Sequence, residues 1–149
     1  MASSRPARPE DISEIARGLP EVTSEPAWGG LPSFKVRGKV FVIYRGPGKD
    51  ALDARGEMIP DAIVISCTAD DKQAMVADPE MPFFTTDHFN GYNAVLVRES
   101  ELGGITRDEL AEVITDAWLA RAPKRVAAQW LAEQQQAVQG TLGSPSDHP

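Results

Sequence analysis

Residues 34–44 read Phe-Lys-Val-Arg-Gly-Lys-Val-Phe-Val-Ile-Tyr, two strand-like runs on either side of an Arg-Gly pair. Glycine readily adopts the positive φ that a two-residue hairpin turn requires, so the pattern predicts a β-hairpin with Arg37 and Gly38 at its turn. In the simplest register Phe34 lies opposite Phe41. A cross-strand aromatic pair of this kind would fix the alignment of the strands and anchor a core.

The segments around the hairpin indicate helices, strands and loops in a definite order. Helical spacing of apolar residues predicts helices over 9–17, about 70–76, 106–121 and from 123 onward. Apolar runs predict strands over 61–68 and 91–98, with a further short strand at 83–85. Residues 20–33 and 45–60 are rich in turn formers or polar residues and indicate loops, the second with room for one more short strand.

Local signals also indicate where these helices begin and end. Gly18 suits the position just past the first helix, Asp70 or Asp71 suits the cap of the second, and Thr106 with Glu109 forms a capping-box pattern. We expect one domain over residues 9–138, with a loose N-terminus over 1–8 and a disordered tail over 139–149.

Strands grouped between helices, with connections mostly too short for parallel crossovers, predict an α+β fold. We expect a two-layer sandwich, an antiparallel sheet with helices packed on one face. Alternation places Phe41 and Ile43 on one side of their strand and Val42 on the other. The strands are apolar on both faces, so the second face of the sheet needs a cover, either the last helix with Trp130 or a partner molecule.

The composition excludes several classes of protein. The chain has 149 residues, 42% of them apolar, one cysteine and a net charge of −7. A lone cysteine rules out an internal disulfide and a multi-cysteine zinc site. The net charge argues against a protein whose whole surface grips nucleic acid. The longest apolar run, residues 40–44, is too short for a signal or a membrane helix, so we expect a cytoplasmic protein with no membrane partner.

Positive charge is concentrated around the predicted hairpin. Between Glu25 and Asp50 the sequence has no acid and five bases: Lys35, Arg37, Lys39, Arg45 and Lys49. A basic two-stranded ribbon on an acidic body could lie on a phosphate backbone, and these five residues are therefore the candidate nucleic-acid-binding residues. The structural alternative is a solvated edge whose lysines prevent sheet-to-sheet aggregation.

The residues of common catalytic and metal sites are sparse. We expect His88 to order the turn of residues 87–92 and to leave no concave pocket lined by other polar groups, because no nucleophile accompanies it. Cys67 shares a strand face with Ile63 and Ile65, which indicates a small buried side chain. The sequence offers no metal ligand set and no phosphate-binding glycine loop, so we expect no catalytic residue, no metal and no cofactor.

A series of short segments, taken in order, resembles the MmcQ/YjbR family of small bacterial proteins. The resemblance covers roughly residues 9–131, and its most specific part is Trp28-Gly29 followed by the hairpin. The segments are Trp28-Gly29, Pro32 to Phe41, Phe83 to His88, Ala94 to Arg98, Asp108 to Leu110, Ala117-Trp118 and Ala122 to Lys124. The resemblance implies a compact α+β fold similar to that of the frataxin-like CyaY proteins, a DNA-binding label, and no agreed catalytic residues.

The sequence therefore predicts a non-enzymatic binding module. The first hypothesis is DNA binding through the basic hairpin. The alternative is a protein-interaction or dimerising domain that uses an apolar sheet face, with no role in nucleic-acid binding. A small-molecule enzyme centred on His88 and Tyr92 is the third hypothesis, and the sequence favours it least.

Overall fold

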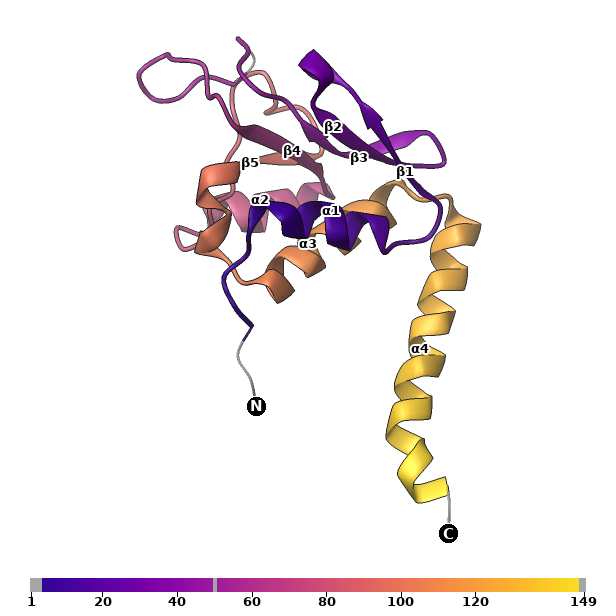
Figure 1. Cartoon of the computed structure of the whole chain (residues 1–149). Helices are drawn as coiled ribbons and strands as arrows, with labels where there is room; N and C mark the ends of the chain where they lie inside the picture. Colours follow the sequence, from indigo (N-terminus) through magenta and orange to yellow (C-terminus); the bar gives the residue numbers. More distant parts are fainter. Residues whose placement is uncertain (1–3, 50, 148–149) are drawn as a thin grey trace.

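The fold is α+β, a five-stranded antiparallel sheet with helices packed against it (Figure 1). The computed structural model describes residues 4–49 and 51–147, without the side chains of residues 28 and 138–147. The strands follow one another in the sheet in chain order. They are β1 (Val22–Pro26), β2 (Pro32–Val36), β3 (Lys39–Tyr44), β4 (Ala62–Ser66) and β5 (Ala94–Arg98).

Within the described residues, four α-helices accompany the sheet, and two short 3-10 turns, η1 (Trp28–Gly30) and η2 (Glu99–Gly104), join elements. The helices are α1 (Pro9–Arg17), α2 (Ala69–Ala77), α3 (Arg107–Arg121) and α4 (Lys124–Asp147). α1 has the predicted bounds, and the capping box of Thr106 and Glu109 at the start of α3 is confirmed. The predicted cap of α2 was wrong: Thr68 caps it, because its hydroxyl accepts from the backbone N–H of Asp71 at 3.1 Å. No helix among the described residues has the length and apolar character needed to cross a membrane.

The predicted hairpin is confirmed, but its register was wrong. Arg37 and Gly38 have φ of 51° and 80°, as a type I′ turn requires. Phe34 pairs with Val42 rather than with Phe41, because a β-bulge interrupts the ladder and Lys35 pairs with Val40. The bulge leaves Phe41 unpaired. Phe41 therefore packs in the same core cluster as Val42, and the predicted grouping of Phe41 with Ile43 was wrong.

The two faces of the sheet are covered by different kinds of structure. On one face, side chains of β2 to β5 such as Ile63 and Val95 pack with Ile12 of α1 and with Leu110 and Trp118 of α3 in the larger core cluster. Figure 1 shows α1, α2 and α3 on this side of the sheet.

On the other face, loops replace helices. Ile43, Val64 and Leu96 pack with Ala51 and Ile59 of the segment between β3 and β4, and with Phe84 and Phe89 of the segment before β5. The predicted short strand at 83–85 is present as a single bridge between Phe84 and Leu96. The expectation that Trp130 covers this face was wrong, because Trp130 packs beside Trp118 in the helix-side cluster and the chain's own loops cover this face.

α4 leaves the body of the molecule after its first turns (Figure 1). Val126 is buried, and Trp130 is half-buried with its ring 5.6 Å from that of Trp118. From Leu131 to Ala137 every residue is exposed. The helix continues to Asp147, past residue 139, and the disordered tail stays a prediction because the side chains of 138–147 are not described and residues 148–149 lie outside the described residues.

One segment expected to be a loop contains a strand: β1 lies within residues 20–33 and pairs with β2 along its whole length. Residues 4–8 lie beside the start of α3, where the Ala7 N–H donates to the Ile105 carbonyl at 2.9 Å and the Arg107 N–H donates to the Arg5 carbonyl at 2.9 Å. Residues 1–3 lie outside the described residues.

Candidate functional site

The five candidate DNA-binding residues occupy different environments. Lys35 pairs with Glu25 on the neighbouring strand at 2.9 Å, and Arg37 pairs with Glu21. Lys39 and Lys49 are exposed, whereas Arg45 is half-buried where β3 ends. The hairpin does not present five unopposed positive charges.

The acids that oppose the hairpin come from β1. Pairing of β1 with β2 sets Glu25 beside Ser33 and Thr23 beside Lys35, so Glu25 reaches the ammonium of Lys35 diagonally across the ladder. Sequence reasoning missed these partners because it placed residues 21 and 25 in a loop. The available signal was an acid at each end of a short segment directly before the hairpin.

Three surface hollows are lined by residues of the segment 85–93, which we call the aromatic loop. It carries the rings of His88, Phe89 and Tyr92. The His88 ring centroid lies 4.8 Å from that of Phe89 and 5.6 Å from that of Tyr92, and the Phe89 and Tyr92 centroids are 5.7 Å apart. Phe89 packs on the second core cluster, whereas Tyr92 is 54% exposed. One aromatic side chain of the loop is therefore anchored and another is presented to solvent.

Lys72 of α2 holds the backbone of the aromatic loop. Its ammonium donates to the carbonyls of Phe89 and Tyr92, each at 2.6 Å, and to that of Asn90 at 3.4 Å. The Tyr92 N–H also donates to the Phe89 carbonyl at 3.0 Å. Charge-assisted hydrogen bonds to three carbonyls within residues 89–92 fix the shape of the turn, so the loop is held from α2 rather than only by its own residues.

A polar hollow of about 470 Å³ lies on the side of the loop that carries His88. Lys49, Asp53 and Asp87 also line it, so the expectation that His88 faces no polar pocket was wrong. The expected backbone bond of His88 is also missing within the described residues, where its contacts are the rings of Phe89 and Tyr92. Asp53 is used locally, since its carboxylate accepts from the N–H groups of residues 55 and 57, which lowers its pKa.

Cys67 lies where the sequence placed it, on the face of β4 that carries Ile63 and Ile65. Burial raises the pKa of its thiol, so the neutral thiol is favoured over the thiolate. It borders a hollow of about 190 Å³ that four acids also line: Asp71, Glu109, Glu112 and Asp116. Burial, with the neighbouring Asp71 and Glu112, raises the pKa of Asp116. No group of three potential ligands among the described residues is arranged to hold a metal ion.

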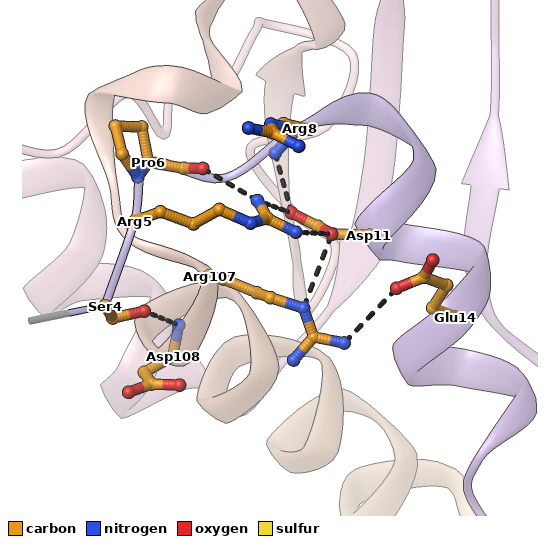
Figure 2. A network of polar contacts seen from close by, with 8 residues as sticks. All are labelled: Ser4, Arg5, Pro6, Arg8, Asp11, Glu14, Arg107 and Asp108. Carbon is orange, nitrogen blue, oxygen red and sulfur yellow. Dashed lines mark hydrogen bonds and ion pairs between the residues drawn. The ribbon is translucent and has the colours of Figure 1, made fainter. Parts of the chain in front are cut away.

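A polar network around Asp11 joins the N-terminal segment to α1 and α3 (Figure 2). The Asp11 carboxylate is buried and accepts from Arg5 at 2.7 and 2.8 Å, from the Arg8 N–H at 2.8 Å, and pairs with Arg107 at 3.4 Å. Arg107 also contacts Glu14. The hydrogen bonds and charge of Arg5 hold the pKa of Asp11 well below its ordinary value of 3.8. The network ties residues 4–8, α1 and α3 together, and we assign it to folding rather than to ligand binding.

The model of the YjbR family matches residues 17–120. Uncharacterised proteins of Mycobacterium bovis and of two Mycobacterium tuberculosis strains are each 36% identical to the chain over 130 residues, which is 83% of this chain and 95% of the relative. No solved structure matches the chain significantly.

Proposed function

The chain belongs to the YjbR family, and from that premise we propose that it is a non-enzymatic binding module that recognises a protein partner through the surface around the aromatic loop. The observation that carries this proposal is the exposed ring of Tyr92 on a loop held in place by Lys72. Exposed aromatic rings on rigid backbone dominate many protein interfaces, because little conformational entropy is lost when they bind.

The absence of an enzyme's local geometry among the described residues supports the non-enzymatic part of the proposal. His88 is exposed and forms no hydrogen bond with another titratable side chain in the described part of the chain. Cys67 carries a raised thiol pKa and packs in the core. General acid–base catalysis uses a histidine within hydrogen-bond reach of the group with which it exchanges a proton. Thiolate chemistry uses an accessible cysteine whose thiol pKa is lowered.

DNA binding through the hairpin is the second candidate function. Lys39 and Lys49 are exposed and lack an ion pair within the described residues, so part of the predicted positive charge stays accessible. The pairing of Lys35 with Glu25 and of Arg37 with Glu21 weakens this candidate, because phosphate contacts would compete with existing carboxylates.

One experiment with two arms separates the candidates. Random-peptide display is performed on the immobilised full-length chain, and in parallel a random-sequence DNA duplex is titrated between about 50 and 200 mM salt. We expect enriched peptides that also bind as free synthetic peptides, and a duplex affinity without a steep salt slope. Failure to enrich any peptide would reject the proposed function, and a steep slope that falls in the Lys39→Gln, Lys49→Gln variant would reinstate the DNA hypothesis.

A further inference from the structure

Two adjoining hollows beside Tyr92 form one continuous groove, which we call the Tyr92 groove. One hollow, of about 460 Å³, lies between α2 and the aromatic loop, and the other, of about 420 Å³, continues to the end of α3. They share Ala69, Gly91, Tyr92 and Asn93. Tyr92 therefore stands in the middle of a path that runs from Val76 on α2 to Arg121 on α3.

The charge of the Tyr92 groove is opposite to that of the molecule as a whole. Its lining includes Lys72 and Arg121 and no carboxylate, although the chain carries a net charge of −7. Neither cation forms an ion pair within the described residues: Lys72 donates to backbone carbonyls, and the Arg121 Nε donates to the Ser66 hydroxyl at 3.3 Å. Two charges held without a carboxylate partner favour a ligand that brings its own negative charge.

The uncharged part of the lining suits an extended peptide. Val76 is 36% exposed and, with Ala69 and the ring of Tyr92, offers an apolar seat for one side chain. Asn90, Asn93 and Gln73 border the same hollow, and the structure shows no hydrogen bond of their side-chain amides among the described residues. Free primary amides can donate to and accept from the main chain of a peptide, which needs both.

We infer that the Tyr92 groove binds an extended acidic peptide segment of a partner protein, with an aliphatic side chain between Tyr92 and Val76 and a carboxylate on Arg121. This inference rests on the proposed function and specifies its site and the chemistry of its partner. Lys72 shapes the groove by holding the loop, and Arg121 recognises the acid.

A single-stranded nucleic acid is the rival occupant, because Tyr92 could also stack on a base. The charges disfavour it. Cys67 borders both the Tyr92 groove and the hollow that carries Asp71, Glu109, Glu112 and Asp116, so a chain of phosphates leaving the groove on that side meets four carboxylates. A peptide with one or two acids avoids that repulsion.

The test uses the full chain and a synthetic library of ten-residue peptides, about one acid and one aliphatic residue in each, with a matched library in which the acid is replaced by lysine. Binding is followed by NMR chemical shifts and by fluorescence anisotropy, and an oligothymidine serves as the nucleic-acid probe. We expect the acidic library to shift the amide signals of Tyr92 and Asn93. Arg121→Gln should weaken binding at least tenfold, as loss of a charge-assisted hydrogen bond does, and Arg125→Gln, on α4 outside the groove, should not.

Charge reversal keeps the test decisive if Arg121→Gln disturbs the contact with Ser66. Arg121→Glu should turn the preference from the acidic to the lysine library, which an unfolded protein cannot do. Peptides that bind the parent but respond equally to Arg121→Gln and Arg125→Gln would overturn the site and leave the proposed function standing. An absence of peptide binding to the parent chain would instead reject both, and oligothymidine binding that shifts Tyr92 would replace the peptide by nucleic acid.

Discussion

Asp11 is a buried carboxylate with three charged or backbone partners: Arg5, the Arg8 N–H and Arg107. Its carboxylate is fully covered, yet the covering side chains of Arg5 and Arg107 are each about one-third exposed, so solvent screens the pairs in part. The Arg8 N–H adds a hydrogen bond that also begins α1. The carboxylate therefore stabilises the fold in its ionised form.

The first prediction is a pH dependence that belongs to Asp11. A carboxyl group with a lowered folded pKa binds a proton first in the unfolded chain, so its stabilisation is complete above the ordinary value of 3.8 and is lost as the pH falls through the lower folded pKa. Asp11→Asn should lower the free energy of unfolding by about 1–2 kcal/mol at neutral pH. Urea titrations at several pH values should show the gap between parent and variant narrowing below about pH 4, and a constant gap would contradict the assignment.

The second prediction concerns the turn of the hairpin. At Gly38, with φ of 80°, a side chain would meet no neighbour within 4 Å but would have to adopt the left-handed region. Gly38→Ala should therefore destabilise the protein by about 1–2 kcal/mol through backbone strain alone. Gly91→Ala is the matched control, since Gly91 also has open space but no positive φ, and thermal unfolding of both variants measures the difference. Equal effects would exclude strain as the cause.

Features that depend on neighbouring residues could be predicted from the sequence, whereas contacts between distant segments could not. The turn at Arg37 and Gly38 was predictable because the required backbone conformation is local. The partners of Asp11 were not, because Arg107 lies far along the chain and Arg5 lies in a segment without periodicity. A run of apolar residues does not indicate where a β-bulge lies. Phe41 was therefore predicted on the sheet face of Ile43, although it packs on the face of Val42.

Among the elements, α2 and the aromatic loop act as a unit. α2 has no buried residue, so it contributes to the fold through two partly exposed side chains. Met75 packs against the larger core cluster, and the Lys72 ammonium donates to the Phe89 carbonyl of the aromatic loop. The loop in turn places Phe89 over the sheet and Tyr92 in solvent. The shape of the proposed binding surface therefore depends on a side chain from another element.

The third prediction tests that dependence. Lys72→Met keeps most of the apolar stem and removes the ammonium, so the carbonyls of Phe89 and Tyr92 lose their donor. We expect a loss of about 1.5–3 kcal/mol in stability and faster hydrogen exchange at the Tyr92 amide, measured by NMR. Lys124→Met, at an exposed position on α4, serves as the control. Unchanged exchange at Tyr92 in the Lys72 variant would show that the loop holds itself.

Elements with a strong local signal were predicted, and the weaker ones were not. α1 and α3 combine apolar periodicity with caps, and both were found within the expected bounds. β1 was missed because Val22–Pro26 lacks an apolar alternation: it is an edge strand, mostly exposed, that ends in proline. Its strand conformation depends on pairing with β2, which residues 22–26 by themselves do not indicate.

For the whole molecule, the distribution of charge differs between sequence and space. Along the sequence, positive charge clusters in residues 35–49, but the fold returns Glu21 and Glu25 to Arg37 and Lys35. The surface around Tyr92 shows the reverse, since Lys72 and Arg121 come from distant segments. The candidate site therefore lay outside the reach of a composition argument, because Lys72, Tyr92 and Arg121 belong to three different elements.

The fourth prediction follows from the ion pairs that neutralise Arg37 and Lys35. The double variant Glu21→Gln, Glu25→Gln releases Arg37 and Lys35 and changes the net charge from −7 by two units to −5. Affinity for a DNA duplex at about 50 mM salt should rise above that of the parent, with a steeper salt slope, by up to about 0.9 per phosphate contacted. Fluorescence anisotropy measures both quantities. The pair Glu101→Gln, Glu112→Gln, at exposed positions away from the hairpin, carries the same net charge and should leave the slope nearly unchanged.

Because helices cover one face of the sheet and loops cover the other, the two sides should unfold in a definite order. Helices with continuous internal hydrogen bonding protect one side, whereas the other is protected by Ala51, Ile59 and Phe84, from segments that form isolated bridges and turns rather than helices. We expect that under heat or mild denaturant the irregular side opens first and exposes Val64 and Leu96 while the ladder of β4 and β5 persists. The rate of aggregation in concentrated solution should then depend on the segment between β3 and β4. A cross-link or a proline that stiffens this segment should slow aggregation without changing the helices.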